Sequence, residues 1–367
     1  MRLLFIVQKF RQGWGGAPES VRLMANQLVE DGINADVYDG GKLIRDVGRL
    51  NLLPPPDQEH APFDPATVRR YEALIQTGPW QRPASNIKTL IAMREARQKL
   101  FYLPRGGLGR AEFNRLRDSK KLPYFALVER GFLRAADGII LSSQIEARNS
   151  ICPARRPAAE HIVPDFVNPL ADTSITWVPG KPMTFSFLAE ISPRKGLLPL
   201  IEAFISWVRR EELSNSVRLI VGGAARPGSE GYLEQVKERC QAAPDVSIEL
   251  RGAIPHHART AFYGDTDVMV VSSHYESYGL TVIEALVQGC AVLAAPNIGA
   301  LEVVGEKMPL SIAAGADKSA LTDGLSQAYA RFHARTEVDR IATRADAGHM
   351  VTAINHIARE RWGALLA

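Results

Sequence analysis

The chain reads Ser272-Ser-His-Tyr-Glu-Ser-Tyr-Gly-Leu-Thr-Val-Ile-Glu-Ala-Leu-Val-Gln-Gly-Cys-Ala-Val-Leu-Ala-Ala-Pro296 in its most informative stretch. The apolar run at 268–271, just before it, predicts a buried parallel strand. A polar turn follows as far as Gly279, and residues 280–288 have helical spacing that Gly289 ends. A strand, a turn, a helix and a second apolar strand in this order favour an α/β fold with a parallel sheet.

Two glutamates flank the start of this predicted helix, with seven residues between them. Glu276 lies in the turn and Glu284 lies on the helix. The backbone N–H groups of Gly279, Leu280 and Thr281 are at the helix N-terminus, where such groups face anions, and a diphosphate fits there. Solvated glutamates are the more common meaning of this spacing alone, but the flanking strands favour a binding site.

This arrangement resembles the E-x7-E signature of glycosyltransferase family 4, retaining enzymes of the GT-B fold that move a sugar from a nucleotide diphosphate. The resemblance implies that Glu276 contacts the donor sugar and that Glu284 holds the ribose hydroxyls. It also implies two Rossmann-like domains with parallel sheets that face a central cleft. The acceptor domain would span 1–170 with a returning helix at 346–367, and the donor domain would span 171–345.

A second motif of the family, Gly-Arg-x-x-x-x-Lys-Gly, is matched in part by Ala189-Glu-Ile-Ser-Pro-Arg-Lys-Gly196. Its lysine, here Lys195, neutralises the donor diphosphate and would act in catalysis together with Glu276. Glu190 stands where the family has arginine, and a carboxylate repels a diphosphate unless it points away or pairs with Arg194. Either Arg194 replaces the missing cation or the donor binds with one charge fewer neutralised.

The resemblance assigns further donor contacts to Gly15 and Gly16 after the first strand, for which a plain flexible turn is the alternative, and to the backbone groups of Ala253 and Ile254 beside the base. Gly222, after the strand at 217–221, lets the backbone pass close either to a donor or to the facing helix. The loop at 8–18 lacks G-x-G-x-x-G, which disfavours a dinucleotide site. The acceptor-side candidates are Thr77, Trp80 and Arg105. Thr77 stands where similar enzymes have histidine, whereas the Pro-Arg-Gly that contains Arg105 matches them.

Other elements follow from local patterns. Residues 39–65 predict a long loop, 122–135 a helix, 142–146 a loop after a strand, and 345–366 a closing helix. Gly299-Ala-Leu-Glu302 is expected to open another helix.

Composition restricts the class of protein. The three cysteines of the 367-residue chain are far apart and have no C-x-x-C pairing, which predicts buried thiols in a reducing cytosol. No metal site is expected, because the neighbouring His256 and His257 face apart on any regular element. No apolar run is long enough for a membrane span. We expect a cytoplasmic protein or one that is peripheral on the inner face of the cell membrane.

Basic residues are concentrated between Arg82 and Arg134, where they outnumber the acidic ones although the whole chain has a net charge of +4. Leucine, isoleucine and phenylalanine are interleaved with them. This composition predicts a surface that docks on anionic lipid, and a solvated face around core residues is the alternative. No nucleic-acid recognition motif accompanies it.

Together these features predict a hexosyltransferase-type, retaining glycosyltransferase. It would move sugar from a UDP- or GDP-linked donor to a glycan or lipid-linked acceptor, in bacterial surface-polysaccharide or glycoconjugate synthesis. No cofactor or metal is implied, because Lys195 and the helix N-terminus would stabilise the leaving diphosphate. A sugar-nucleotide epimerase of the same fold stays open. A degenerate nucleotide-sugar-binding protein also stays open: Glu190 and Thr77 favour it, and Lys195, Glu276 and Glu284 oppose it.

Overall fold

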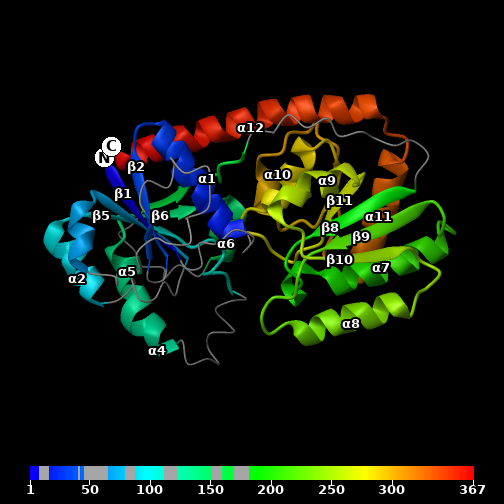
Figure 1. The fold of residues 1–367 in the computed structure, drawn as a ribbon, viewed down its shortest axis with the longest axis horizontal. Coiled ribbons are helices and arrows are strands. Elements are labelled where there is room, and N and C mark those ends of the chain that lie inside the picture. Colours follow the sequence, from blue (N-terminus) through cyan, green and yellow to red (C-terminus); the bar gives the residue numbers. More distant parts are fainter. Residues whose placement is uncertain are drawn as a thin grey trace. The chain divides into compact units, whose positions relative to one another are not determined.

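The computed structural model describes residues 1–7, 16–39, 42–44, 65–78, 87–110, 122–150, 159–168 and 182–367. The chain divides into two compact units (Figure 1). Unit 1 comprises Met1–Phe166 and Ile354–Ala367, and unit 2 comprises Val167–Ala353.

Unit 1 is built on a sheet whose strands lie in the order β3-β2-β1-β4-β5-β6-β7. Neighbouring described strands are parallel except β2 and β3. Their bounds are β1 (Arg2–Val7), β2 (Asn34–Asp39), β3 (Lys42–Ile44), β4 (Ala73–Thr77), β5 (Lys99–Leu103), β6 (Gly138–Leu141) and β7 (Ala159–Ile162).

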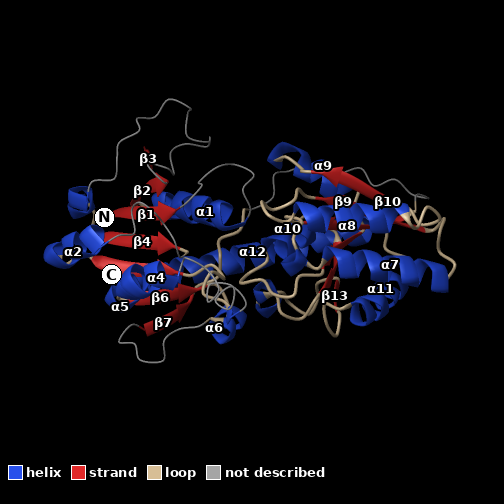
Figure 2. Cartoon of the chain, turned by 90° about the horizontal axis from the view of Figure 1, so that it is seen from below, coloured by secondary structure: helices blue, strands red, loops and turns tan. Residues whose placement is uncertain are grey.

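Both faces of this sheet are covered by helices (Figure 2). Leu3 and Phe5 pack in one core with α1 (Gly16–Glu30), whereas Leu4 and Ile6 pack in a second core with α2 (Ile87–Ala96). Successive side chains of a strand point to opposite faces, so a strand that is buried on both sides is a continuous apolar run. This explains the sequence of β1.

Three expectations for unit 1 need correction. The predicted loop at 39–65 contains the short strand β3, and its residues 40–41 and 45–64 lie outside the described residues. The predicted helix at 122–135 is α4 (Leu122–Tyr124) and α5 (Arg130–Ala135) with a π-helical turn, Phe125–Glu129, between them. The predicted loop at 142–146 already begins α6 (Gln144–Asn149), because the hydroxyl of Ser143 accepts a hydrogen bond from the N–H of Glu146 and caps this helix.

Unit 2 has a second sheet, in the order β10-β9-β8-β11-β12-β13, and all neighbours in it are parallel. The strands are β8 (Met183–Leu188), β9 (Val217–Gly222), β10 (Ile248–Gly252), β11 (Val268–Val271), β12 (Ala291–Ala294) and β13 (Leu310–Ile312). From β8 the chain runs outward to β9 and β10 and then returns to β11 on the other side of β8. Such a reversal places a ligand site at the C-terminal ends of the strands.

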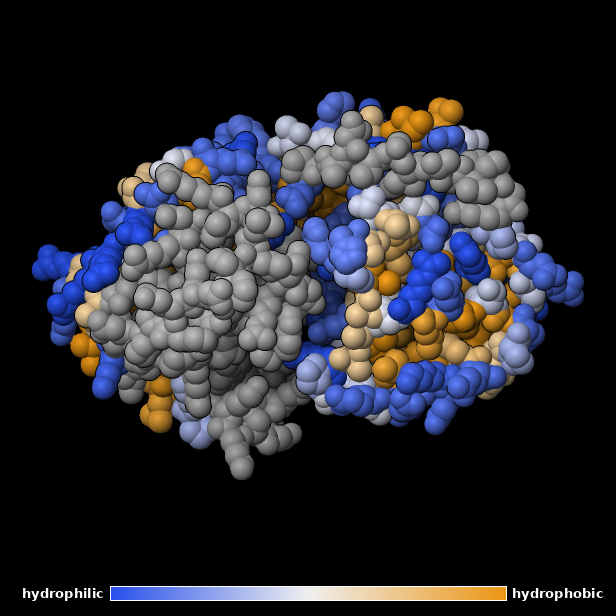
Figure 3. Space-filling view, in the orientation of Figure 1, coloured by the Kyte–Doolittle hydropathy of each residue, from blue (hydrophilic) through white to orange (hydrophobic). Residues whose placement is uncertain are grey.

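The helices of unit 2 surround an aromatic centre. Trp207 lies on α7 (Leu197–Arg210), and its ring meets Phe185 at 5.3 Å and Phe204 at 5.7 Å, edge to face. Pairs in this geometry add about 0.5–1.5 kcal/mol each beyond their burial. Hydrophilic residues lie at the lower right of Figure 3, where α8 (Glu230–Gln241) forms the outer surface. The remaining helices are α9 (Arg259–Gly264), α10 (Leu280–Val287) and α11 (Lys318–Phe332).

Two further expectations differ in unit 2. Gly299–Glu302 forms a short 3-10 turn, and no α-helix begins there. The closing helix, α12 (Glu337–Leu366), starts before the predicted residue 345. Asp339 accepts hydrogen bonds from the backbone N–H and the hydroxyl of Thr336, both 2.8 Å long, and these contacts support the early start. At the far end of α12, Trp362 packs against Phe101 in the core of unit 1.

No described helix is long and apolar enough to cross a membrane.

Candidate functional site

The predicted donor-site residues of unit 2 follow the C-terminal ends of four adjacent strands. Arg194 and Lys195 come after β8, Gly222 ends β9, Ala253 and Ile254 come after β10, and Glu276 comes after β11. Parallel strands bring their C-terminal ends to the same edge of a sheet. The structure therefore gathers residues that are far apart in the sequence.

The loop after β8 is joined directly to the loop after β11. Pro193–Lys195 form a 3-10 turn, and Gly196 begins α7 with a φ of +68°. A Cβ atom on Gly196 would lie 2.2 Å from the carbonyl oxygen of Ser272, so a larger residue does not fit. The Ser272 hydroxyl lies 3.1 Å from the carbonyl oxygens of Lys195 and Gly196, to which it donates. This contact holds the two loops together.

Glu276 accepts charged hydrogen bonds from both basic residues of the β8 loop. The Lys195 Nζ lies 2.5 Å from its Oε1, and Arg194 Nη1 lies 3.4 Å from its Oε2. The hydroxyl of Ser273 also donates to Oε1, at 2.6 Å. The side chains of Lys195 and Glu276 are only 15% and 13% exposed. Because water screens them poorly, their attraction is stronger than that of a surface pair.

The electrostatic surroundings keep Glu276 ionised. Burial acts to raise the pKa of its carboxyl, but the charges of Lys195 and Arg194 and the hydrogen bonds from Lys195 and Ser273 outweigh burial and lower that pKa to about 2. Glu276 is thus a carboxylate at neutral pH and accepts hydrogen bonds without donating a proton.

Glu190, the departure from the family motif, lies between two guanidinium groups. Its Oε1 is 3.3 Å from Arg194 Nη2 and 3.7 Å from Arg226 Nη1. Arg226 comes from the loop after β9, and its backbone N–H donates to the carbonyl of Ile191. The sequence alone does not reveal Arg226, because only the pairing of these two loops places it next to Glu190. Three cations and two carboxylates make this group positive overall.

The backbone of the Glu276 turn is held by the loop after β12. The Glu276 N–H donates to the backbone carbonyl of Asn297, and the N–H of Gly299 donates to the backbone carbonyl of Glu276. Gly279 precedes α10 with a φ of +95°, and a Cβ atom there would lie 2.6 Å from a methyl of Ile298. The N–H groups of Leu280 and Thr281 belong to the first turn of α10, where N–H groups lack partners within the helix.

Glu284 lies about one turn further along α10 and contacts α9. The hydroxyl of Tyr263 donates to its Oε2 at 2.7 Å, and Arg259 Nη1 lies 3.7 Å from its Oε1. No motif in the sequence reveals either partner of Glu284. Burial first, and then the charge of Glu284, raise the pKa of Tyr263 well above its ordinary value, so the phenol stays protonated.

Two predicted contacts around the base have different surroundings. Ala253 is exposed and Ile254 is half-buried. A Cβ atom on Gly222 would lie 2.7 Å from the Ile254 side chain and 3.0 Å from Leu188 and Phe262. Close packing therefore explains the glycine at 222 without any ligand.

The acceptor-side candidates belong to unit 1. Thr77 ends β4, and its buried hydroxyl donates to the carbonyl of Ile6 at 2.8 Å. Arg105 follows β5 with a φ of +50° and forms an ion pair with Asp165. Glu146 accepts a 2.6 Å hydrogen bond from the N–H of Gly106 and so supports this turn. Trp80 and Gly15 lie outside the described residues, and Gly16 begins α1.

Over the residues that the structure describes, no group of histidine, cysteine or acidic side chains is arranged to hold a metal ion.

Part of unit 2 matches a known protein family. Residues 174–342, just under half of the chain, match the model described as Glycosyl transferases group 1. The chain therefore carries a glycosyltransferase group 1 domain.

Two curated relatives are similar over part of the chain. D-inositol 3-phosphate glycosyltransferase of Frankia alni is 30% identical over 166 residues, which are 44% of this chain and 40% of that protein. Alpha-monoglucosyldiacylglycerol synthase of Streptococcus pneumoniae is 25% identical over 193 residues, 49% of this chain and 42% of that protein. The matches span about two fifths of the length of these relatives.

A solved structure is similar over nearly the whole chain. Anabaena Alr3699/HepE in complex with UDP-glucose superposes with a TM-score of 0.69 at 17% identity, over 99% of this chain and 100% of that one. At this identity the likeness shows the fold alone. It confirms the predicted α/β fold class of GT-B type.

Proposed function

We propose that this chain is a retaining hexosyltransferase of glycosyltransferase family 4. It takes a sugar from a UDP- or GDP-linked donor and transfers it to a glycan or lipid-linked acceptor, in bacterial surface-polysaccharide or glycoconjugate synthesis. The observation that carries the proposal is the contact of Lys195 and Arg194 with Glu276 at the C-terminal ends of β8 and β11. The group 1 domain and the UDP-glucose in the HepE structure support it.

The cations would bind the donor diphosphate. Lys195, Arg194 and Arg226 lie on neighbouring loops, next to the N-terminus of α10, which carries partial positive charge. Negative charge on the diphosphate grows as the bond to the sugar breaks, so these groups stabilise the transition state more than the bound donor. In this proposal the chain's own residues carry out the task that a metal ion performs elsewhere.

The glutamates would hold the sugar and the nucleoside. Glu276, with its pKa of about 2, is a carboxylate that accepts hydrogen bonds from sugar hydroxyls. Glu284, one turn from the end of α10, is only part-buried and would accept hydrogen bonds from the ribose hydroxyls.

The experiment is a donor screen followed by product analysis. The purified protein is mixed with UDP- and GDP-sugars, and thermal shift identifies the donor; a ligand at a hundred times its dissociation constant adds about 2.7 kcal/mol to stability. NMR spectroscopy then determines the anomeric configuration after transfer to glycan and lipid-linked acceptors. Retained configuration supports the proposal, and inverted configuration contradicts it. An epimerised donor without acceptor indicates an epimerase, and binding without turnover indicates a degenerate binding protein.

We also propose that unit 1 docks on the anionic cytoplasmic leaflet, where a lipid-linked acceptor would be available. Exposed apolar side chains support this: Ile91 on α2 is 50% exposed and Leu127 in the π-helical turn is 73% exposed. Exposed basic residues lie on the same segments, namely Lys88, Arg94, Arg130 and Arg134. Apolar and basic side chains together are typical of surfaces that bind anionic membranes. Residues 82–86 and 111–121 of the predicted basic region lie outside the described residues.

Liposome sedimentation tests this surface. Binding to anionic vesicles should fall as salt rises and should fall further when these four basic residues are changed to glutamine. The matched control changes four basic residues of unit 2 to glutamine: Arg209, Arg210, Lys237 and Arg239. An equal loss of binding in both variants indicates a general charge effect, and no binding at low salt favours a soluble acceptor.

A further inference from the structure

The carboxylate of Glu284 is held on both oxygens by a single helix. Tyr263 donates to Oε2 at 2.7 Å, and Arg259, one turn earlier on α9, lies 3.7 Å from Oε1. Residues four apart lie on the same face of a helix, so α9 presents both groups to one carboxylate. The Tyr263 side chain is buried, and its residue is only 2% exposed. A charge-assisted hydrogen bond in such a place restricts the rotation of its acceptor.

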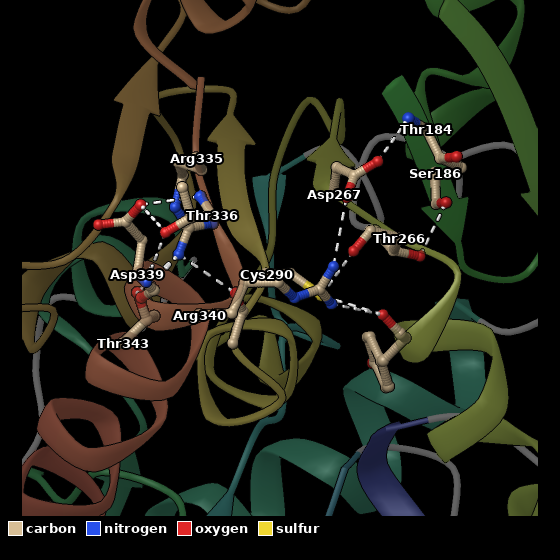
Figure 4. Close-up of polar contacts among 12 residues, drawn as sticks. Thr184, Ser186, Thr266, Asp267, Cys290, Arg335, Thr336, Asp339, Arg340 and Thr343 are labelled. Carbon is tan, nitrogen blue, oxygen red and sulfur yellow. Dashed lines mark hydrogen bonds and ion pairs between the residues drawn. The ribbon is translucent and has the colours of Figure 1, made fainter. Parts of the chain in front are cut away.

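The C-terminal end of α9 is fastened in turn. The carbonyl of Tyr263 accepts hydrogen bonds from Arg340 Nη2 at 3.3 Å and from the Cys290 thiol at 3.4 Å. Arg340 Nη1 lies 3.2 Å from Asp267, whose second oxygen accepts from the N–H of Thr184 at 2.8 Å. Figure 4 shows the Arg340 guanidinium between Asp267 and Cys290. α9 is thus joined to the starts of β8 and β11.

The end of α10, the helix that carries Glu284, is also held by residues at the start of α12. Arg335, just before α12, donates to the carbonyl of Gly289 at 3.2 Å, at the end of α10. A Cβ atom on Gly289 would lie 2.8 Å from the carbonyl oxygen of Arg340, so the two segments are in close contact. Contacts from the start of α12 therefore fix both helices that form the Tyr263–Glu284 hydrogen bond.

We propose that Tyr263 is a positioning residue that sets the Glu284 carboxylate for the two hydroxyls of a ribose, and so makes the site prefer ribonucleotides to 2′-deoxyribonucleotides. The inference rests on the proposed function, in which Glu284 holds the donor ribose. A free glutamate side chain loses rotational freedom when it binds two hydroxyls, and Tyr263 supplies that order before the ligand arrives. A 2′-deoxyribonucleotide offers one hydroxyl and gains less from a fixed carboxylate.

The test is a double-mutant cycle in which nucleotide affinity is measured. Calorimetry measures the affinities of UDP, GDP and their 2′-deoxy forms for the wild type, Tyr263→Phe, Glu284→Gln and the double variant. In Tyr263→Phe, the ribonucleotide should bind about three- to tenfold more weakly. The affinity of Tyr263→Phe for the 2′-deoxyribonucleotide should stay within about twofold of the wild-type affinity. The preference for the ribonucleotide over its 2′-deoxy form should therefore be smaller in this variant. In the Glu284→Gln background, Tyr263→Phe should have no further effect, because its action passes through that carboxylate.

The matched control is Tyr232→Phe, the same chemical change on α8, where the hydroxyl accepts a hydrogen bond from the N–H of Leu198. It should leave the preference unchanged. If Tyr263→Phe fails to fold, Arg259→Gln replaces it, and a smaller loss of preference is expected.

Three results would overturn the proposal. Equal weakening of ribose and deoxyribose forms shows a structural role only, and so does a loss that persists in the Glu284→Gln background. If Tyr263→Phe folds and binds the ribonucleotides as tightly as the wild type, Tyr263 does not position the Glu284 carboxylate. If neither UDP nor GDP binds the wild type, the proposed function fails and this inference fails with it, whereas nucleotide binding without the narrowed preference contradicts the inference alone.

Discussion

Lys195 and Glu276 form an ion pair with 2.5 Å between Nζ and Oε1, although 81 positions separate them in the sequence. The pair forms because β8 and β11 are neighbours in the sheet and each loop follows the C-terminal end of its strand. The lysine that would face a diphosphate is thus paired with the carboxylate that would face the sugar. Binding of the donor would therefore reorganise this pair.

Lys195→Ala should reduce turnover more than donor affinity. The charge of the leaving diphosphate is largest in the transition state, so kcat should fall about 100- to 1,000-fold while the donor KM changes much less. Steady-state kinetics with the identified donor measures both, and Lys237→Ala on α8 is the matched control. A raised KM with unchanged kcat would mean that Lys195 only binds the donor.

The two glutamates should differ in their kinetic effects. Glu284→Ala should weaken donor binding, because it removes hydrogen bonds to the ribose, whereas Glu276→Gln should mainly slow transfer. Each should cost about 1.5–3 kcal/mol, or roughly ten- to a hundredfold or more. Unchanged transfer kinetics in both variants would contradict the roles proposed for Glu276 and Glu284.

Glu276 should stabilise the fold in a pH-dependent way. Its pKa falls from 4.5 to about 2 on folding, so its contribution is complete above about pH 4.5 and is lost as the pH falls towards 2. The difference in unfolding free energy between wild type and Glu276→Gln should therefore shrink by about 1.4 kcal/mol between about pH 7 and about pH 3.5. Urea denaturation measures it, with Glu234→Gln as control. A difference that is the same at both pH values contradicts the ion pair.

Glu190 should oppose donor binding by holding two cations. Glu190→Gln should raise donor affinity about two- to threefold at low salt, because it frees Arg194 and Arg226 for the diphosphate. Arg226→Ala should lower the affinity, and Arg226→Lys should restore part of it. Calorimetry at two salt concentrations measures these effects, with Arg239→Ala as the matched control. If neither Glu190→Gln nor Arg226→Ala changes the affinity, these residues take no part in binding.

Arg340→Ala should destabilise the protein strongly. Arg340 and Asp267 form a largely buried pair, with side chains 8% and 18% exposed, and removal of one partner leaves the other charge uncompensated. The loss should be about 3–5 kcal/mol in chemical denaturation. Arg209→Ala, which breaks an exposed pair with Asp245, should have little effect. If Arg340→Ala lowers the free energy of unfolding as little as Arg209→Ala does, the Arg340–Asp267 pair does not stabilise unit 2.

Strands buried on both faces were the easiest elements to predict from sequence. The sequence predicts Val268–Val271 with the bounds that the structure has, because such a strand is a short apolar run. Elements that depend on polar contacts were harder. α12 starts at Glu337, where Thr336 and Asp339 hydrogen-bond to each other, and the apolar residues of its first turns, Val338 and Ile341, are exposed. The π-helical turn at Phe125–Glu129 has no pattern of its own in the sequence.

The sequence by itself determined the local geometry of the candidate site. Apolar runs set the strands, and the polar turn with Gly279 set the place where α10 begins, because these features depend on neighbouring residues and on the few conformations that each residue type adopts. It therefore placed Glu276 in the turn before that helix and Glu284 on the helix itself.

Only the tertiary structure decided which of these residues meet. Glu190 lies between Arg194 and Arg226, and Tyr263 donates to Glu284, because the order of strands in the sheet brings separate loops to one edge and packs α9 against α10. The pKa of Glu276 depends on the same assembly. Burial and two cations from another strand's loop act on it together, and Coulombic interactions depend on distance in space, whatever the separation along the chain.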